Sequence, residues 1–267
     1  REDYPGGYPM LYDPASGTTK VYPITVPHQG INSIAPDESR GVFYVSTCSD
    51  GRPGPGENSI LARVDLKTGK AKEIIDTKHI YGFICIDSRG RVYHPTLGGR
   101  IVRYDPDADR VDLLDQTIDG RPPLKETHLA DPAPGHPINW DMSPDGKTLY
   151  AVAMSSNHLY AYDVTGDGKT LAGRDLGVLI PGAKSTDCRA MCVGPTGTVR
   201  VAVTEDVPGF GNRLHLVDYK PGDTSPRDRG VVKVTNPDFT EFNDKDGRQL
   251  PWHGGFEKQK DGSLLTK

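Results

Sequence analysis

The sequence predicts an all-β fold made of many short antiparallel strands joined by turns. Glycine and proline number 31 and 23, together about a fifth of the 267 residues, which is far more turn-forming residue than a helical protein carries. Short apolar runs nevertheless recur along the whole chain, which argues against disorder. A strand, turn and strand pattern also repeats roughly every fifty residues.

One half of the repeat is a hairpin in which an apolar strand ends at an aspartate. It occurs five times, in "MLYDPASGTTKVYPI", "LARVDLKTGKAKEII", "IVRYDPDADRVDLL", "LYAYDVTGDGKTLAG" and "LHLVDYKPGDTSPRD". Asp, Gly and Pro residues between the two strands favour a tight turn, so each copy is expected to be a β-hairpin. The five aspartates, spaced 52, 40, 58 and 55 residues apart, are Asp13, Asp65, Asp105, Asp163 and Asp218.

The other half of the repeat is a second hairpin that precedes each of these except the first. It is found around "SIAPDESRGVFYVST", "ICIDSRGRVYHPT", "DMSPDGKTLYAVA" and "MCVGPTGTVRVAV", and a fifth copy, "FEKQKDGSLLTK", ends the chain. Two hairpins make a four-stranded antiparallel sheet, and sheets repeated at this period are the blades of a β-propeller. We name the strands of a blade A to D from the axis outward.

The count of hairpins predicts a single domain, residues 1–267, with five blades. Four blades are continuous, namely residues 25–76, 77–134, 135–184 and 185–252, and a fifth is shared between residues 253–267 and 1–24. Sharing a blade between the termini removes exposed sheet edges. The alternative is part of a six- or seven-bladed propeller, if the chain is a piece of something longer.

Charge and hydropathy argue against two classes of partner. The formal net charge is -4 and the Lys and Arg residues are scattered, so nucleic acid is not expected as a partner. No apolar run approaches the roughly 18 residues of a membrane span, and the opening "REDYPGGYPM" is no signal peptide. The cysteines, Cys48, Cys85, Cys188 and Cys192, form neither a CxxC pair nor a zinc knuckle. Cys85 and Cys192 fall in apolar strand patterns and are expected to be buried thiols.

Histidines collect at the start of the predicted A strands. Aligning the blades on their A to B turns places His28, His136 and Asp187 at one equivalent position, with His79 and His253 one residue away. Eight histidines placed at random would put about 0.45 in these five short segments, whereas four are found there. Because A strands run beside the propeller axis, these side chains are expected to converge on one polar ring. The alternative is that they cap strands and bind water in a solvent-filled channel.

A ring of this composition suits a divalent transition metal. Imidazole is the usual ligand for such ions, and several imidazoles with one carboxylate and open positions favour Zn, Mn or Fe over Mg or Ca. The predicted metal ligands are His28, His79, His136, His253 and Asp187.

Other residues near this face carry candidate catalytic and binding roles. Arg189 is the natural clamp for a carboxylate substrate, and Tyr81, two residues beyond His79, is a candidate general acid or base. The longest predicted loops lie on the same face, where loops on a rigid scaffold usually carry binding function. His158 and His215 fall in C strands, where packing or a rim position is expected. These loops contain acidic, basic and aromatic residues, namely Asp50, Arg52, His94, His128, Glu205, Asp206, Phe210 and Trp252. Three of them, Arg52, His94 and Trp252, are predicted to bind substrate.

The stretches "INWDMSPDGKTLYAVAMSSNHLYAYDV" and "DSRGRVYHPTLGGRIVRYDP" resemble blades of the gluconolactonase (senescence marker protein) propellers. They resemble those of virginiamycin B lyase and oligogalacturonate lyase more loosely. The similarity covers most of the chain but rests on blade-building residues, so it implies fold more than function. The gluconolactonase pattern places its metal-binding asparagine at Asn139, which we count among the substrate-binding candidates. Met154 and Ser155 stand where the pattern has an Asp, and Arg189 and Ala190 replace its later Asp-Gly.

Two functions are therefore predicted. The first is an axial-pocket propeller enzyme, a lyase or lactonase-type hydrolase that acts on a carbohydrate-derived or lactone substrate with a histidine-ligated metal. The alternative is a non-catalytic binding or scaffold module that holds a glycan, peptide or protein partner on its loop face. By analogy with other propellers, a secreted or periplasmic location is expected.

Overall fold

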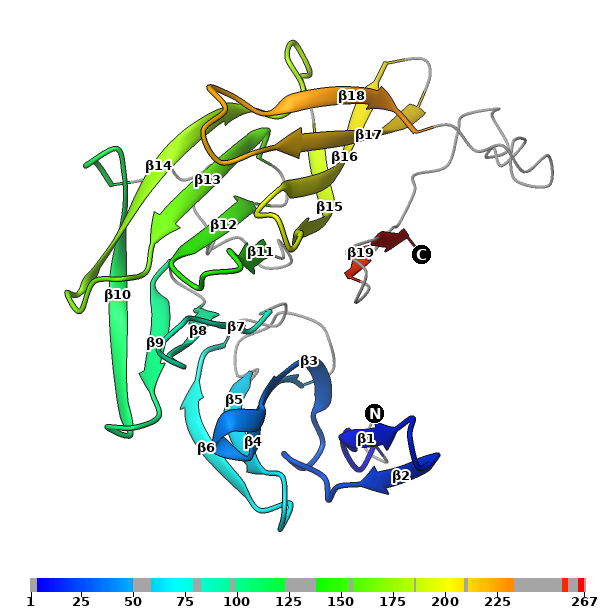
Figure 1. The fold of residues 1–267 in the computed structure, drawn as a ribbon, viewed down its shortest axis with the longest axis vertical. Helices are drawn as coiled ribbons and strands as arrows, with labels where there is room; N and C mark the ends of the chain where they lie inside the picture. The colour runs from blue at the N-terminus through cyan, green and yellow to red at the C-terminus, as the bar shows by residue number, and fades with distance from the viewer. Residues whose placement is uncertain are drawn as a thin grey trace. The chain divides into compact units, whose positions relative to one another are not determined.

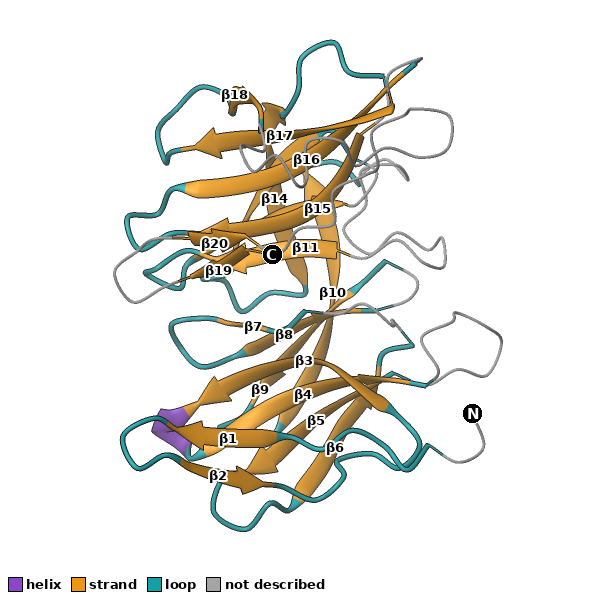
Figure 2. Cartoon of the chain, turned by 90° about the vertical axis from the view of Figure 1, so that its right-hand side faces the viewer, coloured by secondary structure: helices purple, strands orange, loops and turns teal. Residues whose placement is uncertain are grey.

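The computed structural model confirms an all-β chain (Figures 1 and 2). The only helical segment in the part of the chain that it describes is the short 3-10 turn Glu38–Arg40, and no helix there is long and apolar enough to cross a membrane. The chain divides into two compact units, one of residues 1–115 and 130–137 and one of residues 116–129 and 138–267. The described residues are 4–49, 59–78, 83–96, 99–122, 138–153, 156–184, 186–208, 211–232, 256–258 and 264–266.

The first unit contains a hairpin and two antiparallel sheets. The hairpin is exposed along both of its strands, β1 (Met10–Asp13) and β2 (Thr18–Val21). In the first of the two sheets each strand pairs with the next one in the sequence. Its strands are β3 (Gly30–Asp37), β4 (Val42–Cys48), β5 (Ile60–Asp65) and β6 (Ala71–Asp76). The strands of the other sheet pair in the same order and are β7 (Cys85–Ile86), β8 (Val92–Pro95), β9 (Ile101–Asp105) and β10 (Arg110–Ile118). The last residues of β10 belong to the second unit.

The second unit contains two four-stranded groups and a terminal hairpin. The first group is β11 (Ile138–Met142), β12 (Thr148–Ala153), β13 (His158–Asp163) and β14 (Thr170–Val178). The second group is β15 (Thr186–Val193), β16 (Val199–Val207), β17 (Gly211–Tyr219) and β18 (Arg227–Val231). The hairpin is β19 (Phe256–Lys258) and β20 (Leu264–Thr266).

The predicted hairpins are confirmed, and four of their aspartates fold the turns directly. Asp65 Oδ1 accepts hydrogen bonds from the Thr68 backbone N–H at 2.6 Å and from the Thr68 hydroxyl at 2.8 Å. These bonds lower the pKa of the Asp65 carboxyl below its usual value. Asp13, Asp105 and Asp163 accept from backbone N–H groups two residues on in the same way. Such local bonds are what makes Asp favourable in turns.

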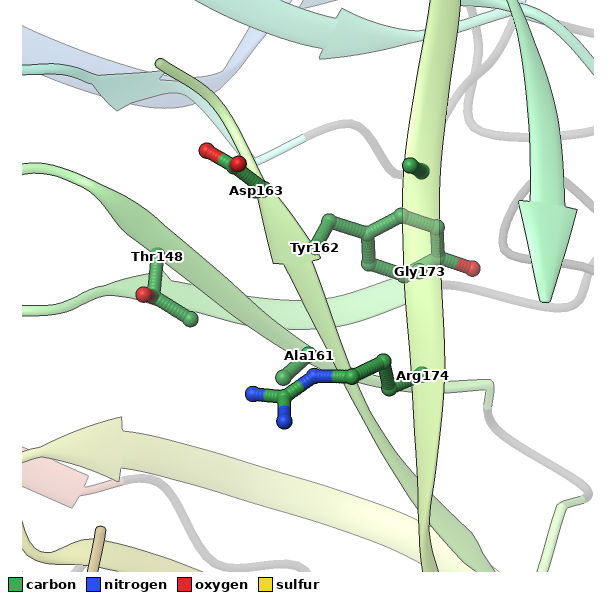
Figure 3. A pocket seen from close by; sticks show the side chains of 7 residues that line it. Thr148, Ala161, Tyr162, Asp163, Gly173 and Arg174 are labelled. Carbon is green, nitrogen blue, oxygen red and sulfur yellow. The ribbon is translucent and has the colours of Figure 1, made fainter. Parts of the chain in front are cut away.

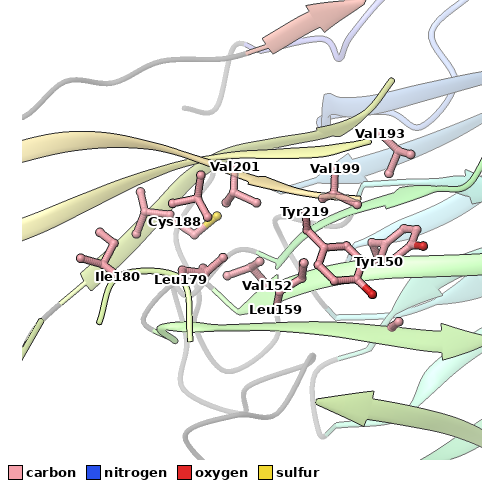
Figure 4. Packing of buried hydrophobic residues seen from close by; sticks show 13 residues of the cluster. Tyr150, Val152, Leu159, Leu179, Ile180, Cys188, Val193, Val199, Val201 and Tyr219 are labelled. Carbon is pink, nitrogen blue, oxygen red and sulfur yellow. The ribbon is translucent and has the colours of Figure 1, made fainter. Parts of the chain in front are cut away.

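The inner strands of each sheet are buried almost continuously, as β4 and β8 show, whereas the outer strand β14 begins with alternating exposed and buried residues. In the second unit a buried cluster joins β12 and β13 to β15, β16 and β17, and it includes Val152, Leu159, Val201 and Val217 (Figure 4). A corresponding cluster in the first unit contains the rings of Tyr44 and Tyr104, whose centroids are 6.2 Å apart in an edge-on arrangement. Cys85 and Cys192 are buried, as expected, and all four cysteines are thiols.

The number of blades and the single-domain arrangement stay predictions. The strands of residues 25–76, 135–184 and 185–252 form one four-stranded group each. Within the second unit, the chain at the end of β10 lies beside β14, where the Asp119 N–H donates to the Gly173 carbonyl at 2.9 Å. The hairpins β1–β2 and β19–β20 are each a two-stranded sheet within their own unit, and the blade that the prediction builds from both of them stays a prediction.

Candidate functional site

His28 lies in the turn before β3 and has an unusual backbone conformation and one ring hydrogen bond. Its φ of 62° is in the left-handed region, which is uncommon for a residue with a side chain. Its Nδ1 is 3.0 Å from the Tyr4 carbonyl oxygen, and because a carbonyl only accepts, Nδ1 carries the proton. Nε2 is then the ring nitrogen that can offer a lone pair, and the imidazole is exposed. A metal-binding histidine commonly donates its second ring nitrogen in this way.

A buried network of hydroxyl groups, which sequence reasoning missed, fixes the end of the sheet beside His28. The Thr47 hydroxyl donates to Gln29 Oε1 at 2.5 Å, and the Ser59 hydroxyl donates to the Thr47 carbonyl at 2.6 Å. The Thr77 hydroxyl donates to the Ser59 carbonyl at 2.8 Å. The signal in the sequence is a Ser or Thr at one end of three successive strands.

His94, a predicted substrate-binding residue, is fully buried in β8. Its Nδ1 donates to the Pro95 carbonyl at 2.7 Å, so Nε2 accepts the hydrogen bond from the Ser46 hydroxyl, also at 2.7 Å. Ser46 is fully buried as well. Both ring nitrogens therefore have partners inside the protein, and a substrate role for His94 stays a prediction.

In the second unit, Asn139 of β11 is joined to the neighbouring strand β15. Its side chain Nδ2 donates to the Cys188 carbonyl at 2.8 Å, and both residues are buried. The pairing of β15 with β16 shifts register between Cys188 and Ala190, so Arg189 is the extra residue of a β-bulge. Bulges are frequent next to active sites because they redirect a side chain. Asn139 therefore holds the backbone beside the predicted carboxylate clamp.

Asp187 lies inside β15, directly opposite Thr204 of β16. His28, by contrast, precedes its strand β3 altogether. The turn-based alignment gave these two residues one equivalent position, and the strand register does not reproduce it. The reason is that Pro36 and Asp37 are still paired within β3, whereas β15 ends at Val193, two residues before Pro195.

The remaining predicted site residues lie outside the described residues. They are Arg52, His79, Tyr81, His136, Trp252 and His253. Within the described ranges, no group of three or more His, Cys, Asp or Glu side chains is arranged to hold a metal ion. The metal ring therefore stays a prediction that rests on the sequence.

Two histidine–aspartate pairs, which sequence reasoning missed, are built in the same way in successive sheets. His158 Nδ1 is 2.8 Å from Asp175 Oδ2, and His215 Nδ1 is 2.9 Å from Asp228 Oδ2. Each histidine is on a C strand and each aspartate is on the D strand beside it, next to a shift of register.

A glycine with positive φ completes each of these pairs. Gly177 has a φ of 107° and donates its N–H to Asp175 Oδ1 at 2.8 Å. Gly230 has a φ of 95° and donates to Asp228 Oδ1 at 2.7 Å. The signal in the sequence is the repeated R-D-x-G-V of residues 174–178 and 227–231.

A small pocket of about 240 Å³ lies on the sheet β11–β14 (Figure 3). It is lined by small side chains, such as Ala161, and by Thr148, Asp163 and Arg174. Ligand pockets usually measure about 300–1,000 Å³, so this one is small, and we assign no role to it.

The comparisons with known proteins show the fold. No protein family matches the sequence, and no curated protein matches it. Among solved structures, the chain is similar to a 6-phosphogluconolactonase-like protein from Bacteroides uniformis, with 15% identity and a TM-score of 0.55, over 97% of this chain and 76% of that one. It is similar to the periplasmic gluconolactonase of Pseudomonas aeruginosa, with 16% identity and a TM-score of 0.52, over 97% and 76%.

A third similar structure is a catalytically inactive histidine-to-alanine variant of virginiamycin B lyase from Staphylococcus aureus with quinupristin. The identity is 14% and the TM-score 0.55, over 97% of this chain and 66% of that one. At such identities a likeness establishes architecture and leaves chemistry open. These neighbours are β-propeller proteins, and the chain has the β-propeller type of fold.

Proposed function

We propose that the chain is a propeller enzyme, a lyase or hydrolase that acts on a carbohydrate-derived or lactone substrate at a histidine-ligated metal. The observation that carries the proposal is the collection of four of the eight histidines at the start of A strands. The His28 tautomer, in which Nδ1 carries the proton and Nε2 keeps the lone pair that a metal needs, supports it. So does the similarity of fold to lactonases and to a lyase whose histidine-to-alanine variant is inactive.

The proposed ligands are His28, His79, His136, His253 and Asp187, around a Zn, Mn or Fe ion. These residues would hold the ion, which would supply polarisation of a carbonyl or carboxylate group and a lower pKa for bound water.

The other residues would bind, orient and move protons. Arg189 would hold a substrate carboxylate, because a guanidinium matches a carboxylate with two parallel hydrogen bonds. Tyr81 would donate or accept a proton at its phenol oxygen. Asn139 would keep the backbone next to Arg189 in place. Arg52, His94 and Trp252 would contribute to substrate binding from the loops.

Metal analysis of the purified chain and of two variants tests the proposal. We expect close to one equivalent of Zn, Mn or Fe, and its loss in His28→Ala and His136→Ala because each removes a ligand. His158→Ala is the matched control, since that ring is partly exposed and bonded to Asp175 outside the proposed ring. Retention of the metal by both ring variants, or loss in the control, would contradict the proposal.

The competing function, a non-catalytic binding or scaffold module for a glycan, peptide or protein, predicts the opposite pattern. The ring variants would then leave ligand binding unchanged, and Phe210→Ala or Trp252→Ala would weaken it. A glycan array probed with the wild type and these four variants separates the two functions.

The similarity to known propeller structures also bears on the cellular location of the protein. We expect a secreted or periplasmic protein, supported by the similarity to a periplasmic gluconolactonase. Fractionation of cells that produce the natural gene product would check this, and recovery in the cytosolic fraction would contradict it.

A further inference from the structure

His215 of β17 lies between two carboxylates in the second unit. Its Nδ1 is 2.9 Å from Asp228 Oδ2 of β18, and its Nε2 is 3.3 Å from Glu205 Oε2 of β16. The residue is only 8% exposed, whereas the carboxylate side chains are 22% and 23% exposed. The cluster therefore reaches the surface through its carboxylates and is closed on the side of the imidazole.

The two ring nitrogens of His215 are not equivalent. Nδ1 makes a hydrogen bond, and its acceptor Asp228 is held by the Gly230 N–H at 2.7 Å. Nε2 is buried and has no hydrogen-bond partner, although a carboxylate oxygen is 3.3 Å away. In a neutral ring that donates through Nδ1, the lone pair of Nε2 faces the negative Glu205 oxygen. A cation between the two atoms would turn this repulsion into two favourable contacts.

From this geometry we infer that His215 Nε2 and Glu205 Oε2 form a second metal site, which takes a divalent transition-metal ion of the zinc type. Imidazole and carboxylate together suit such ions. Two ligands that each lie about 2.0–2.2 Å from a tetrahedral zinc ion are about 3.3–3.5 Å apart, and the observed separation is 3.3 Å. Asp228 then has the role of a carboxylate that orients a metal-binding histidine through its other nitrogen.

The site is an open one with two protein ligands. The second carboxylate, Asp228, is bonded to the opposite side of the ring, and water that enters past the partly exposed Glu205 would take the remaining positions around the ion. Arg213 is directly opposite Glu205 in the pairing of β16 with β17, and residues opposite each other share a face of the sheet. Its positive charge weakens binding of a cation, so the affinity is modest.

The His158–Asp175 pair is an internal control. It has the same bulge and the same Nδ1 bond, and its ring is partly exposed. Glu205 stands two residues beyond Val203, the partner of His215. In the sequence, Ser155 stands two residues beyond Ala153, the end of β12, and it lies outside the described residues. A serine hydroxyl adds no negative charge, so no ion is expected to bind there.

Metal titration of the full chain tests the inference in a background that lacks the proposed ring site. The protein carries His28→Ala and His136→Ala, is stripped with a chelator, and is titrated with Co²⁺ by absorption and with Zn²⁺ by calorimetry. We expect one equivalent of ion, and binding at least about tenfold weaker in Glu205→Gln. Asp228→Asn should weaken it about 10–100-fold, the range for partners that orient metal ligands. Arg213→Gln should strengthen it, and His158→Ala should leave it unchanged.

The outcomes separate this site from the proposed function. Absence of binding in the background, equal binding in Glu205→Gln, or loss in His158→Ala would overturn the inference. Nitrogen NMR of His215 gives a second readout, because a bound ion shifts the Nε2 signal strongly. A doubly protonated ring that zinc does not change would also overturn it. If instead the wild type binds no more metal than the background, the ring site fails and the His215 site stands.

Discussion

Asn139 is a buried side chain that connects two sheets by one hydrogen bond. The sequence marked it as a candidate for ligand binding, and the structure gives its amide nitrogen a backbone partner at 2.8 Å. That partner, the Cys188 carbonyl, is fully buried next to a β-bulge. A buried carbonyl that loses its donor is destabilised because water cannot replace the bond. The residue therefore has a structural role whether or not it also contacts a ligand.

Asn139→Ala should lower the free energy of unfolding by about 1–3 kcal/mol, the range for an unsatisfied buried polar group. Asn139→Asp should be at least as harmful, because a carboxylate would face the carbonyl oxygen. Urea unfolding followed by circular dichroism measures both. The exposed substitution Lys169→Ala is the control, and a change below about 0.5 kcal/mol in Asn139→Ala would contradict the role.

Ser46→Ala should also destabilise the first unit, by about 1–3 kcal/mol, because it leaves His94 Nε2 buried without the 2.7 Å hydrogen bond. The metal content of the chain should not change, since neither residue is in the proposed ring. Thermal unfolding and metal analysis of one preparation check both statements. If the Ser46→Ala variant keeps a normal melting temperature but loses substrate binding, direct substrate binding by His94 would be favoured instead.

At the scale of single elements, the bulged D strands depend on glycine. Gly230 has a φ of 95°, and a Cβ placed on it would meet no atom within 4 Å. The obstacle to a side chain at this position is therefore backbone conformation alone. Because Gly230 also donates to Asp228, any change in its backbone reaches His215 through that aspartate.

Gly230→Ala should lower the free energy of unfolding by about 1–2 kcal/mol, since L-residues are strained at this φ. Gly168→Ala is a matched control, because it has the same open surroundings and no positive φ, and it should be neutral or slightly stabilising. Denaturant unfolding compares the two. Equal effects would mean that the bulge does not need its left-handed glycine.

At the scale of the whole molecule, each unit is held by cores rich in buried tyrosine. Burial raises the pKa of Tyr44 to about 12 and of Tyr104 to about 12. A folded-state pKa above the unfolded value of about 10 means that the folded chain holds the phenol proton more tightly. This contribution to stability is complete below pH 10 and is lost as the pH rises through the folded value.

Tyr44→Phe should therefore flatten the decline of stability between about pH 10 and 12. At pH 7 it should be neutral or mildly stabilising, because the Tyr44 hydroxyl is buried and makes no hydrogen bond among the described residues. Urea unfolding at several alkaline pH values measures the slope. An unchanged slope would show that this phenol does not titrate with unfolding.

What could be predicted from the sequence depends on how far along the chain the deciding contacts reach. The hairpins were predictable because residues such as Asp65 and Asp163 bond to groups two or three positions away. The same locality made the buried thiols of Cys85 and Cys192 predictable from their strand patterns.

Site residues were harder to place because their surroundings come from distant strands. The burial of His94 depends on Ser46, 48 residues away, and the bond of Asn139 reaches Cys188, 49 residues away. The unequal places of Asp187 and His28 within their own sheets depend on where each A strand ends, which the turn alignment did not include.

The sequence by itself determined the repeating strands, their turns and the all-β class, since each follows from neighbouring residues and from the alternation of apolar side chains. Only the tertiary structure decided which polar groups meet, such as His215 with Glu205 and Asp228. Those contacts depend on strand register, because one bulged residue changes which side chains are opposite each other.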